Sequence, residues 1–336
     1  MVLNSDFLKL SSEIGSNFFL VQGAGGNTSF KNDQSMWIKA SGTWLMDSVR
    51  KNIFVSVDDN MIRLGVKSLL DDPLKGVLLD KNSLRPSIET TLHALMPHRI
   101  VIHTHPIELL PWLVLKEGKA ILSDLLELKT FAWVDYIRPG LELAHAVRLE
   151  LEKNPSEILF LGNHGLVVGG DDCESSENKM RSILKKCTKT PRVNPKFNED
   201  LIKIGAKFSM RPAKYRITHS LATDEISYFY CNEENGILYP DQAVFLGKTI
   251  NCYDNGDNSQ SIGSFINSKA PPPYIIIKGV GVLVSINATK DVDEMLRCHA
   301  EVLLRIEEGQ KLGYLTDNEV SRLLNWDAEK YRQTIK

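Results

Sequence analysis

The chain has 336 residues, of which 43% are hydrophobic and 24% are charged, and its formal net charge is −2 at pH 7. This length predicts two domains or one large domain, and the composition is that of an ordinary globular protein that can build an apolar core. The nearly balanced charge and the lack of a Lys/Arg cluster argue against a protein that binds nucleic acid. We therefore expect a small-molecule substrate.

Cysteine usage and apolar patterning predict the compartment. The five cysteines, at positions 173, 187, 231, 252 and 298, are widely spaced and form no Cys-x-x-Cys pair. This spacing favours reduced thiols over disulfides or a zinc ribbon. The N-terminus has no cationic start followed by an apolar core, and no apolar run reaches the roughly 18 residues of a membrane span. We expect a cytoplasmic protein without a membrane segment.

The N-terminal part of the chain predicts a helix, a glycine-rich loop and three strands. Residues 4–15 place apolar side chains at helical spacing. The following V-Q-G-A-G-G-N-T-S-F, at 21–30, contains a loop whose backbone can approach a ligand closely and offer N–H groups to an anion. It matches neither of the two standard nucleotide fingerprints, so a plain glycine-rich turn is the alternative. A hairpin that ends at Ser41-Gly42 and a strand at 53–57 follow.

The segment Arg85–Pro106, R-P-S-I-E-T-T-L-H-A-L-M-P-H-R-I-V-I-H-T-H-P, divides at Pro97. Its first half predicts a helix with Ser87 as a candidate N-cap, and its β-branched second half predicts a buried strand. Because alternate residues of a strand share a face, His103 and His105 should lie roughly 6–7 Å apart on one side. Two imidazoles side by side on a buried strand are unfavourable unless they are hydrogen-bonded or bind a metal ion.

Glu89 and His93 are four residues apart on the predicted helix and so share a face, which can bring a carboxylate toward the two strand histidines. Each also has a structural explanation. The helix dipole alone favours Glu89 in a first turn, and a single helical histidine such as His93 is usually a packing or surface residue.

A second informative stretch lies further along the chain. Leu141–Lys153 predicts a helix, and E-I-L-F-L-G-N-H-G-L-V-V-G-G, at 157–170, predicts two buried strands joined by a tight turn. His164 lies at the tip of this turn between small residues, where it has no packing role. It is the natural third ligand of a metal site. A helix that ends near Cys187 closes the unit.

Taken in order, G-A-G-G-N-T-S, K-A-S-G, S-x-E-x-x-x-H, H-T-H-P and G-N-H-G-L resemble the class II aldolase and adducin head family, which includes the fuculose- and rhamnulose-phosphate aldolases and ribulose-phosphate 4-epimerase. The resemblance covers residues 5 to about 190. It implies a three-layer α/β (αβα) fold whose central, mainly antiparallel sheet is flanked by helices. It also implies a homo-oligomer, typically a tetramer, and a class II aldolase-like catalytic domain at 1–190.

The same resemblance implies an activity and a site. Glu89 would be the catalytic acid/base, and the ligands of a divalent metal ion, most often Zn²⁺, would be His103, His105 and His164. The residues that bind the substrate phosphate would be Gly26, Asn27, Ser41, Gly42 and Ser87. The implied enzyme is a metal-dependent aldolase, a carbon–carbon lyase of carbohydrate metabolism. It would cleave a ketose 1-phosphate of the rhamnulose- or fuculose-phosphate type, through an enediolate, to dihydroxyacetone phosphate and an aldehyde.

Several departures from the family pattern leave the substrate open. Ile88 stands where the sugar-phosphate aldolases have a second serine, and Tyr136 lies in a different local context from their general-acid tyrosine. Arg138 could complement the charge of a different anion. Epimerisation, dehydration and decarboxylation on the same scaffold are alternatives. So is a non-catalytic adducin-like binding module, although the retained histidines and Glu89 count against it.

Residues 197–336, beyond a proline-punctuated linker, exceed what a single-domain aldolase needs. Within them, I-I-I-K-G-V-G-V-L-V-S and a predicted helix parallel F-L-G-N-H-G-L-V-V-G-G and its helix. Aligning Gly281 with Gly165 places Val280 where His164 lies in the first copy. We predict a degenerate second copy without the metal ligand, with an unrelated cap as the alternative. The two-part layout is similar to the aldolase portion of the rhamnulose-phosphate aldolase/dehydrogenase fusions.

Overall fold

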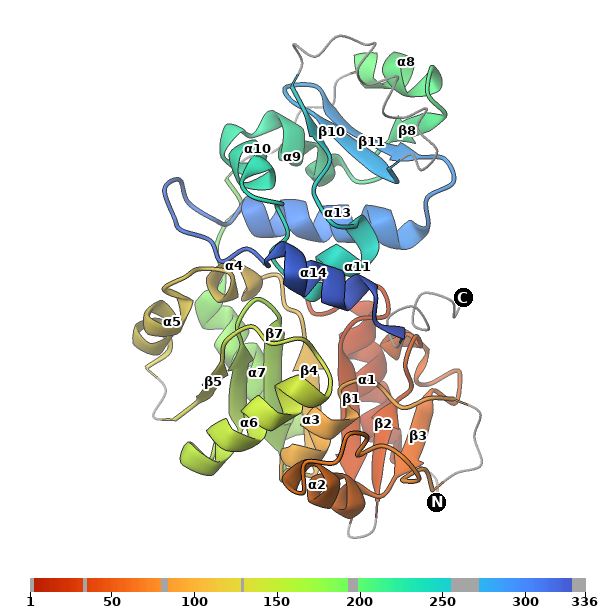
Figure 1. Cartoon of the computed structure of the whole chain (residues 1–336), viewed down its shortest axis with the longest axis vertical. Coiled ribbons are helices and arrows are strands. Elements are labelled where there is room, and N and C mark those ends of the chain that lie inside the picture. The colour runs from red at the N-terminus through yellow and green to blue at the C-terminus, as the bar shows by residue number, and fades with distance from the viewer. Residues whose placement is uncertain are drawn as a thin grey trace. The chain divides into compact units, whose positions relative to one another are not determined.

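The computed structural model describes residues 3–32, 35–79, 84–127, 130–192, 199–254 and 272–327 (Figure 1). The chain forms two compact units. The first unit comprises Met1–Leu113, Glu117–Thr188 and Asn325–Lys336, and the second comprises Val114–Lys116 and Lys189–Leu324. Residues 193–196 of the predicted linker (188–196) lie outside the described part of the chain.

The first unit is built around a seven-stranded sheet in the order β3-β2-β1-β4-β7-β6-β5. Neighbouring strands run antiparallel except β5 and β6, which are parallel. The strands are β1 (Asn27–Lys31), β2 (Met36–Lys39), β3 (Phe54–Val57), β4 (Ile100–Thr104), β5 (Ala132–Val134), β6 (Ile158–Leu161) and β7 (Gly165–Gly170). The predicted central, mainly antiparallel sheet is confirmed.

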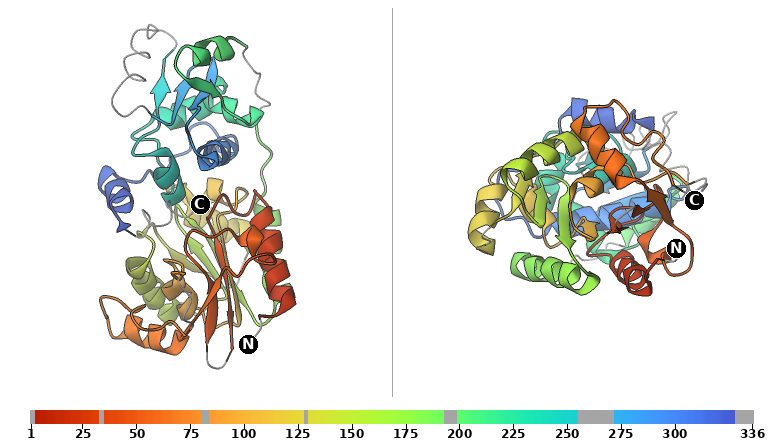
Figure 2. Two further views of the ribbon diagram at one scale, coloured as in Figure 1. Left: turned by 90° about the vertical axis from the view of Figure 1, so that its right-hand side faces the viewer. Right: turned by 90° about the horizontal axis from the view of Figure 1, so that it is seen from below.

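Helices cover both faces of this sheet (Figure 2). One face packs against α1 (Ser5–Ser16), η1 (Leu45–Asp47), α4 (Leu110–Leu113), α5 (Gly118–Leu126) and α7 (Cys173–Cys187). The other face packs against α2 (Asp59–Lys67), α3 (Thr90–Leu95) and α6 (Leu141–Lys153). The three-layer α/β arrangement follows from apolar side chains on both sides of each central strand.

The alternation of side chains along β4 decides which layer contains the candidate site. Ile102 belongs to the hydrophobic cluster between the sheet and the layer of α1 and α7. Val101 belongs to the cluster on the opposite face, between the sheet and the layer of α3 and α6. Thr104 also points toward α7, because its Oγ1 lies 3.8 Å from Met180 Sδ. His103 therefore shares the face of Val101, on the side of α3.

Helix α3 begins at Thr90 with Glu89 at its N-cap, so the expectation of an N-cap at Ser87 was wrong. The cause is a turn that precedes the helix. The Oγ of Ser87 accepts a hydrogen bond from the backbone N–H of Glu89 at 3.3 Å, and the carbonyl of Ser87 accepts from the backbone N–H of Thr90 at 3.1 Å. This turn places the Glu89 side chain at the end of the helix, where it is free to face the strands.

Alternate residues of β1 hold α3 along its whole length. Asn27 Nδ2 donates to Glu89 Oε2 at 2.8 Å, and Ser29 Oγ lies 2.8 Å from His93 Nδ1. Lys31 Nζ donates to carbonyl groups at the C-terminal end of α3, including that of His93 at 2.7 Å. Because all three residues point to one side of the strand, β1 fixes the position of the helix that carries Glu89.

The second unit contains a four-stranded sheet in the order β8-β11-β10-β9. Its strands are β8 (Met210–Pro212), β9 (Cys252–Tyr253), β10 (Tyr274–Ile277) and β11 (Gly281–Ser285). Its helices are α8 (Asp200–Ala206), η2 (Arg216–His219), α9 (Ser220–Thr223), α10 (Glu225–Asn232), α11 (Pro240–Leu246), α13 (Lys290–Leu303) and α14 (Asp317–Leu324). Like the first unit, it is a mixed α/β unit.

The β10–β11 hairpin and the following α13 correspond to the β6–β7 hairpin and α7 of the first unit. Both hairpins have a three-residue turn whose middle residue has a positive φ, 53° at Asn163 and 68° at Gly279. Val280 follows Gly279 as His164 follows Asn163. This local correspondence is consistent with a degenerate second copy, which stays a prediction.

All five cysteines lie in the described part of the chain and none forms a disulfide, which agrees with the prediction of reduced thiols. Among the described helices, none combines the length and the apolar character needed to span a membrane.

Lys31 should make stability depend on pH. Burial lowers the pKa of this lysine from 10.5 to about 7, and the opposing effect of Asp59 offsets only part of the shift. The unfolded chain therefore binds more protons than the folded chain between about pH 7 and pH 10.5, so rising pH favours the folded state in this window.

The free energy of unfolding should rise there by up to about 1.4 kcal/mol per pH unit, and this slope should be lost in Lys31→Met. Urea unfolding of both chains at several pH values measures the two slopes. Equal slopes would contradict the assignment.

Candidate metal centre

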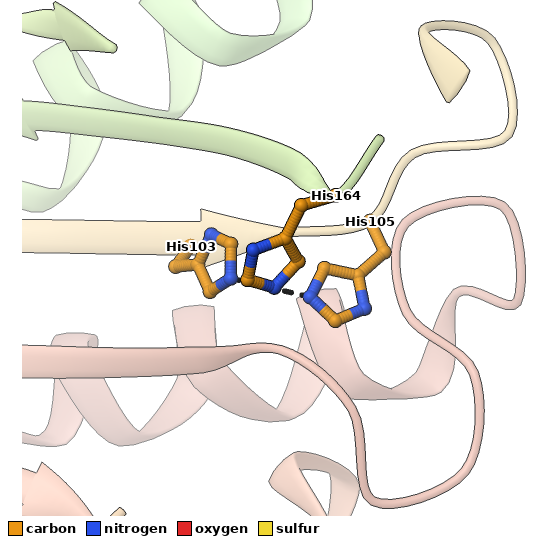
Figure 3. Close-up of side chains that lie close together, drawn as sticks. All are labelled: His103, His105 and His164. Atoms are coloured by element: carbon orange, nitrogen blue, oxygen red, sulfur yellow. Dashed lines mark hydrogen bonds between the residues drawn. The ribbon is translucent and has the colours of Figure 1, made fainter. Parts of the chain in front are cut away.

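Three histidine side chains converge at one end of the central sheet (Figure 3). His103 lies near the end of β4, His105 follows the strand, and His164 lies in the β6–β7 turn. One nitrogen from each ring lies within 4.8 Å of the other two. The Nε2 atoms of His103 and His105 are 3.2 Å apart, and the ring centroids of all three pairs are 4.9–5.0 Å apart. The structure thus brings the three predicted ligands together.

The backbone of the β6–β7 turn makes this convergence sterically feasible. Asn163 adopts a left-handed φ of 53°, which closes the turn and directs His164 toward β4. Gly165 follows, and a Cβ atom there would lie 2.4 Å from the carbonyl oxygen of Thr104 and 2.9 Å from His105 Cδ2. Only a glycine therefore lets the turn approach the end of β4 this closely.

A backbone hydrogen bond orients the His103 ring. His103 Nδ1 lies 3.0 Å from the carbonyl oxygen of Leu166, so Nδ1 carries the proton and Nε2 offers its lone pair to the cluster. His103, His105 and His164 are buried, with exposed fractions of 0%, 7% and 5%. Neutral imidazoles that share a small volume at a sheet end are a suitable donor set for a borderline divalent ion such as Zn²⁺.

Glu89 lies directly beside the histidines. Its Oε1 is 3.3 Å from His103 Nε2 and 3.4 Å from His164 Nε2, while its Oε2 accepts the hydrogen bond from Asn27. Burial alone raises the pKa of this carboxyl, but the facing imidazoles of His103, His164 and His105 outweigh it and hold the pKa well below its usual value. The group is therefore ionised at neutral pH.

These residues fit a divalent metal ion. Oε1 of Glu89 is buried and has no hydrogen-bond partner among the described residues, although buried carboxylate oxygens normally have one. A cation held by the three imidazoles would compensate this charge. With such a cation present, Oε2 would keep its hydrogen bond from Asn27 and the charge on Oε1 would be compensated as well.

His93 does not join the cluster. Its ring bonds Ser29, and burial lowers its pKa well below the usual value, so it is a neutral packing residue. This outcome agrees with the structural explanation that its sequence position allowed.

The five candidate phosphate-binding residues lie on three neighbouring loops. Asn27 Nδ2 is 3.3 Å from Ser87 Oγ, so the glycine-rich loop and the segment before α3 meet. Gly26 has a φ of 59°, and a Cβ there would lie 2.4 Å from Val21 Cγ1. The backbone N–H of Ser41 donates to the carbonyl of Arg85 at 2.9 Å, which brings the Ser41-Gly42 turn to the same segment.

Lys39 is a residue of this region that the sequence interpretation missed. Its buried Nζ donates to the carbonyl of Ala24 at 3.0 Å and to that of Thr43 at 2.8 Å. It therefore ties the glycine-rich loop to the Ser41-Gly42 turn and places a positive charge between them. The signal was present in K-A-S-G, where the lysine ends β2 two residues before Ser41.

The fold and the site define a three-layer α/β protein in which three convergent buried histidines, which could hold a metal ion, lie beside a buried carboxylate. Residues 7–188 match the family model for the Class II Aldolase and Adducin N-terminal domain, and the chain belongs to this family.

A curated relative is similar over part of the chain. The uncharacterized oxidoreductase YuxG of Bacillus subtilis (strain 168) is 30% identical over 221 residues, which cover 61% of this chain and 32% of that protein. The chain thus spans about a third of the length of this curated relative.

Two solved structures are similar to part of the chain. The N-terminal class II aldolase domain of a conserved protein from Thermoplasma acidophilum is 25% identical, with a TM-score of 0.48, and covers 56% of this chain and 93% of its own. L-fuculose-1-phosphate aldolase from Thermus thermophilus is 15% identical, with a TM-score of 0.37. The match covers 55% of this chain and 92% of the aldolase chain.

Removing one imidazole should release the metal ion. We expect about one divalent ion per purified wild-type chain. Loss of a residue that only hydrogen-bonds a ligand typically weakens metal affinity by roughly 10- to 100-fold. His105→Ala removes a ligand itself, so its affinity for the metal ion should fall by at least that factor. Metal content after dialysis, measured by plasma mass spectrometry, tests this. His98→Ala, which changes a partly buried histidine outside the cluster, is the control. Equal metal content in His105→Ala and wild type would contradict the assignment.

Proposed function

We propose that this chain is a metal-dependent class II aldolase that cleaves a ketose 1-phosphate, of the rhamnulose- or fuculose-phosphate type, to dihydroxyacetone phosphate and an aldehyde. The observation that carries the proposal is the placement of Glu89 Oε1 within 3.4 Å of two of three convergent imidazoles. Membership of the class II aldolase and adducin family supports it. We also propose that the enzyme acts in the cytoplasm as a homo-oligomer, a tetramer by family resemblance.

His103, His105 and His164 would hold the metal ion, for which Zn²⁺ is our assignment. When bound, the ion supplies a Lewis acid that stabilises the negative charge on the substrate carbonyl oxygen as the carbon–carbon bond breaks. The protein contributes the fixed geometry. His103 keeps its orientation through the Leu166 carbonyl, and Gly165 keeps the turn of His164 close to β4.

Glu89 moves the proton. In the direction of synthesis its ionised Oε1 removes a proton from the hydroxymethyl carbon of dihydroxyacetone phosphate, and in the direction of cleavage it returns that proton to the enediolate carbon. Asn27 holds Oε2 in place, so Oε1 stays on the side of the histidines. Because its pKa lies below the usual value, Glu89 is ionised at neutral pH and has a free lone pair to accept the proton.

The phosphate of the substrate would lie among the three loops that meet at α3. Their backbone N–H groups and hydroxyls suit an anion, and the buried Lys39 ammonium adds positive charge. The residues we assign to this contact are Gly26, Asn27, Ser41, Gly42 and Ser87. Phosphate bound here would fix the reacting carbon relative to Glu89, which lies two residues after Ser87.

Proton exchange tests the chemical role of Glu89 without knowledge of the aldehyde. Wild-type enzyme in D₂O should exchange one hydrogen of dihydroxyacetone phosphate, which NMR detects directly. Glu89→Gln should keep its metal ion but lose roughly 10²- to 10⁴-fold in exchange rate, because the amide cannot accept the proton. Loss of metal and exchange together in Glu89→Gln would show that the carboxylate is a ligand instead of the base.

Phosphate dependence tests the other half of the site. Unphosphorylated dihydroxyacetone should exchange at least tenfold more slowly than its phosphate at equal low concentration, because it lacks charge-assisted hydrogen bonds that each contribute about 1.5–3 kcal/mol. Ser41→Ala should raise KM for dihydroxyacetone phosphate but not for dihydroxyacetone. The ratio of the two exchange rates should therefore be smaller in this variant than in wild type. Equal rates for both compounds with wild-type enzyme would exclude a phosphorylated substrate.

A further inference from the structure

His105 lies beyond the strand pairing that holds the end of β4. The pairing of β4 with β1 ends at His103, and its pairing with β7 ends at Thr104. The other two histidines have their own supports, because the carbonyl of Leu166 orients the His103 ring and the β6–β7 turn directs His164. Sheet pairing therefore does not fix the position of His105, and another part of the chain must do so.

The segment 18–22, between α1 and the glycine-rich loop, holds the backbone around His105. The backbone N–H of His105 donates to the carbonyl of Leu20 at 3.0 Å, and the backbone N–H of Ile107 donates to that of Phe19 at 2.9 Å. The proline between these two residues restricts His105 to extended backbone conformations. The segment 18–22 therefore continues the support of the chain where the strand pairing stops.

Gln22 completes this support through its side chain. It is only 2% exposed, and its Nε2 donates to the carbonyl of Phe18 at 2.7 Å and to the carbonyl of His105 at 3.4 Å. A side-chain amide has two N–H donors, so one hydrogen is available for each carbonyl. Both partners can only accept, which means that the nitrogen of the amide, and not its oxygen, faces them. The bond to Phe18 keeps the second N–H directed at His105.

Both peptide groups of His105 are thus held by one short segment. Leu20 accepts from its N–H, and Gln22 donates to its carbonyl. Fixing these two groups sets the direction of the Cα–Cβ bond, after which the imidazole has only a few rotamers to choose from. The same part of the chain also lies against the other ligand of β4, since a Cβ atom at Gly26 would be 3.0 Å from the carbonyl oxygen of His103.

We propose that Gln22 is a positioning residue of the candidate metal centre, whose amide holds the backbone of His105 where the imidazole can reach the ion. This inference rests on the metal centre of the proposed function and adds to it a residue that lies outside the ligand set. Without the amide, His105 has more freedom, and binding the ion must first order it. Loss of an outer-shell partner typically weakens metal affinity by roughly 10- to 100-fold. Because Gln22 bonds the backbone of His105 and not its ring, we expect the lower value.

Metal binding by the full-length Gln22→Met variant tests this role. Methionine is similar in size to glutamine but cannot donate to the two carbonyls. Affinity for Zn²⁺, measured by competition with a chromophoric chelator, should fall about tenfold. The visible absorption of the Co²⁺-loaded chain, which reports ligand geometry, should change in position or intensity. Gln22→Asn keeps an amide that is one methylene too short to reach both carbonyls, so its affinity should fall in the same direction.

Gln242→Met is the matched control, because Gln242 is also a buried glutamine that cross-links its surroundings. Its Nε2 donates to the carbonyl of Gly236 at 3.0 Å and lies 3.3 Å from His299 Nε2, and it is 0% exposed. This variant should lose stability in urea unfolding as Gln22→Met does. Its Zn²⁺ affinity and its Co²⁺ spectrum should nevertheless match those of wild type, because Gln242 contacts no residue of the histidine cluster in these bonds.

Wild-type affinity and spectrum in both Gln22 variants would overturn the proposal and leave the metal centre in place. An equal loss of affinity in Gln242→Met would also overturn it, because the effect would then be general destabilisation. A wild-type chain that binds neither Zn²⁺ nor Co²⁺ would overturn the metal centre itself and this role with it. None of these measurements depends on proton exchange by Glu89, so the two proposals can fail separately.

Discussion

The structure depends on keeping a carboxylate charged inside a protein. Glu89 is buried, and a buried charge is unfavourable by several kcal/mol unless neighbouring groups compensate it. Here one oxygen accepts a hydrogen bond from Asn27 and the other faces two imidazoles. The three imidazoles could also hold a cation, whose charge would compensate that of Glu89.

Strand β1 couples the two parts of this arrangement. Asn27 is paired in register with His103 across β1 and β4, and it also bonds Glu89. Ser29 and Lys31 extend the contact along α3, so the helix cannot shift without breaking buried hydrogen bonds. The sheet therefore fixes the position of the carboxylate relative to the histidines on β4.

Much of the first unit follows from local sequence patterns. The three strands around the glycine-rich loop, the helix Leu141–Lys153 and the hairpin that displays His164 match the structure, because hydrophobic periodicity and turn residues act over a few neighbours. The sequence also predicted that His103 and His105 lie close together, and their Nε2 atoms are 3.2 Å apart, although His105 lies just beyond the end of β4. The first residue of α3 could not be predicted from local patterns. The turn at Ser87 competes with an earlier helix start, and contacts of Ser87 with Asn27 of β1 favour the turn.

The sequence by itself determined the family, the three histidines and the carboxylate, because each lies in a short segment whose secondary structure sets its direction. Only the tertiary structure decided that Lys31 and Lys39 are buried and donate to backbone carbonyls, and that Trp326 meets Arg138 nearly two hundred residues away. Such contacts depend on how layers pack across long chain separations, and no periodicity of the sequence encodes that packing.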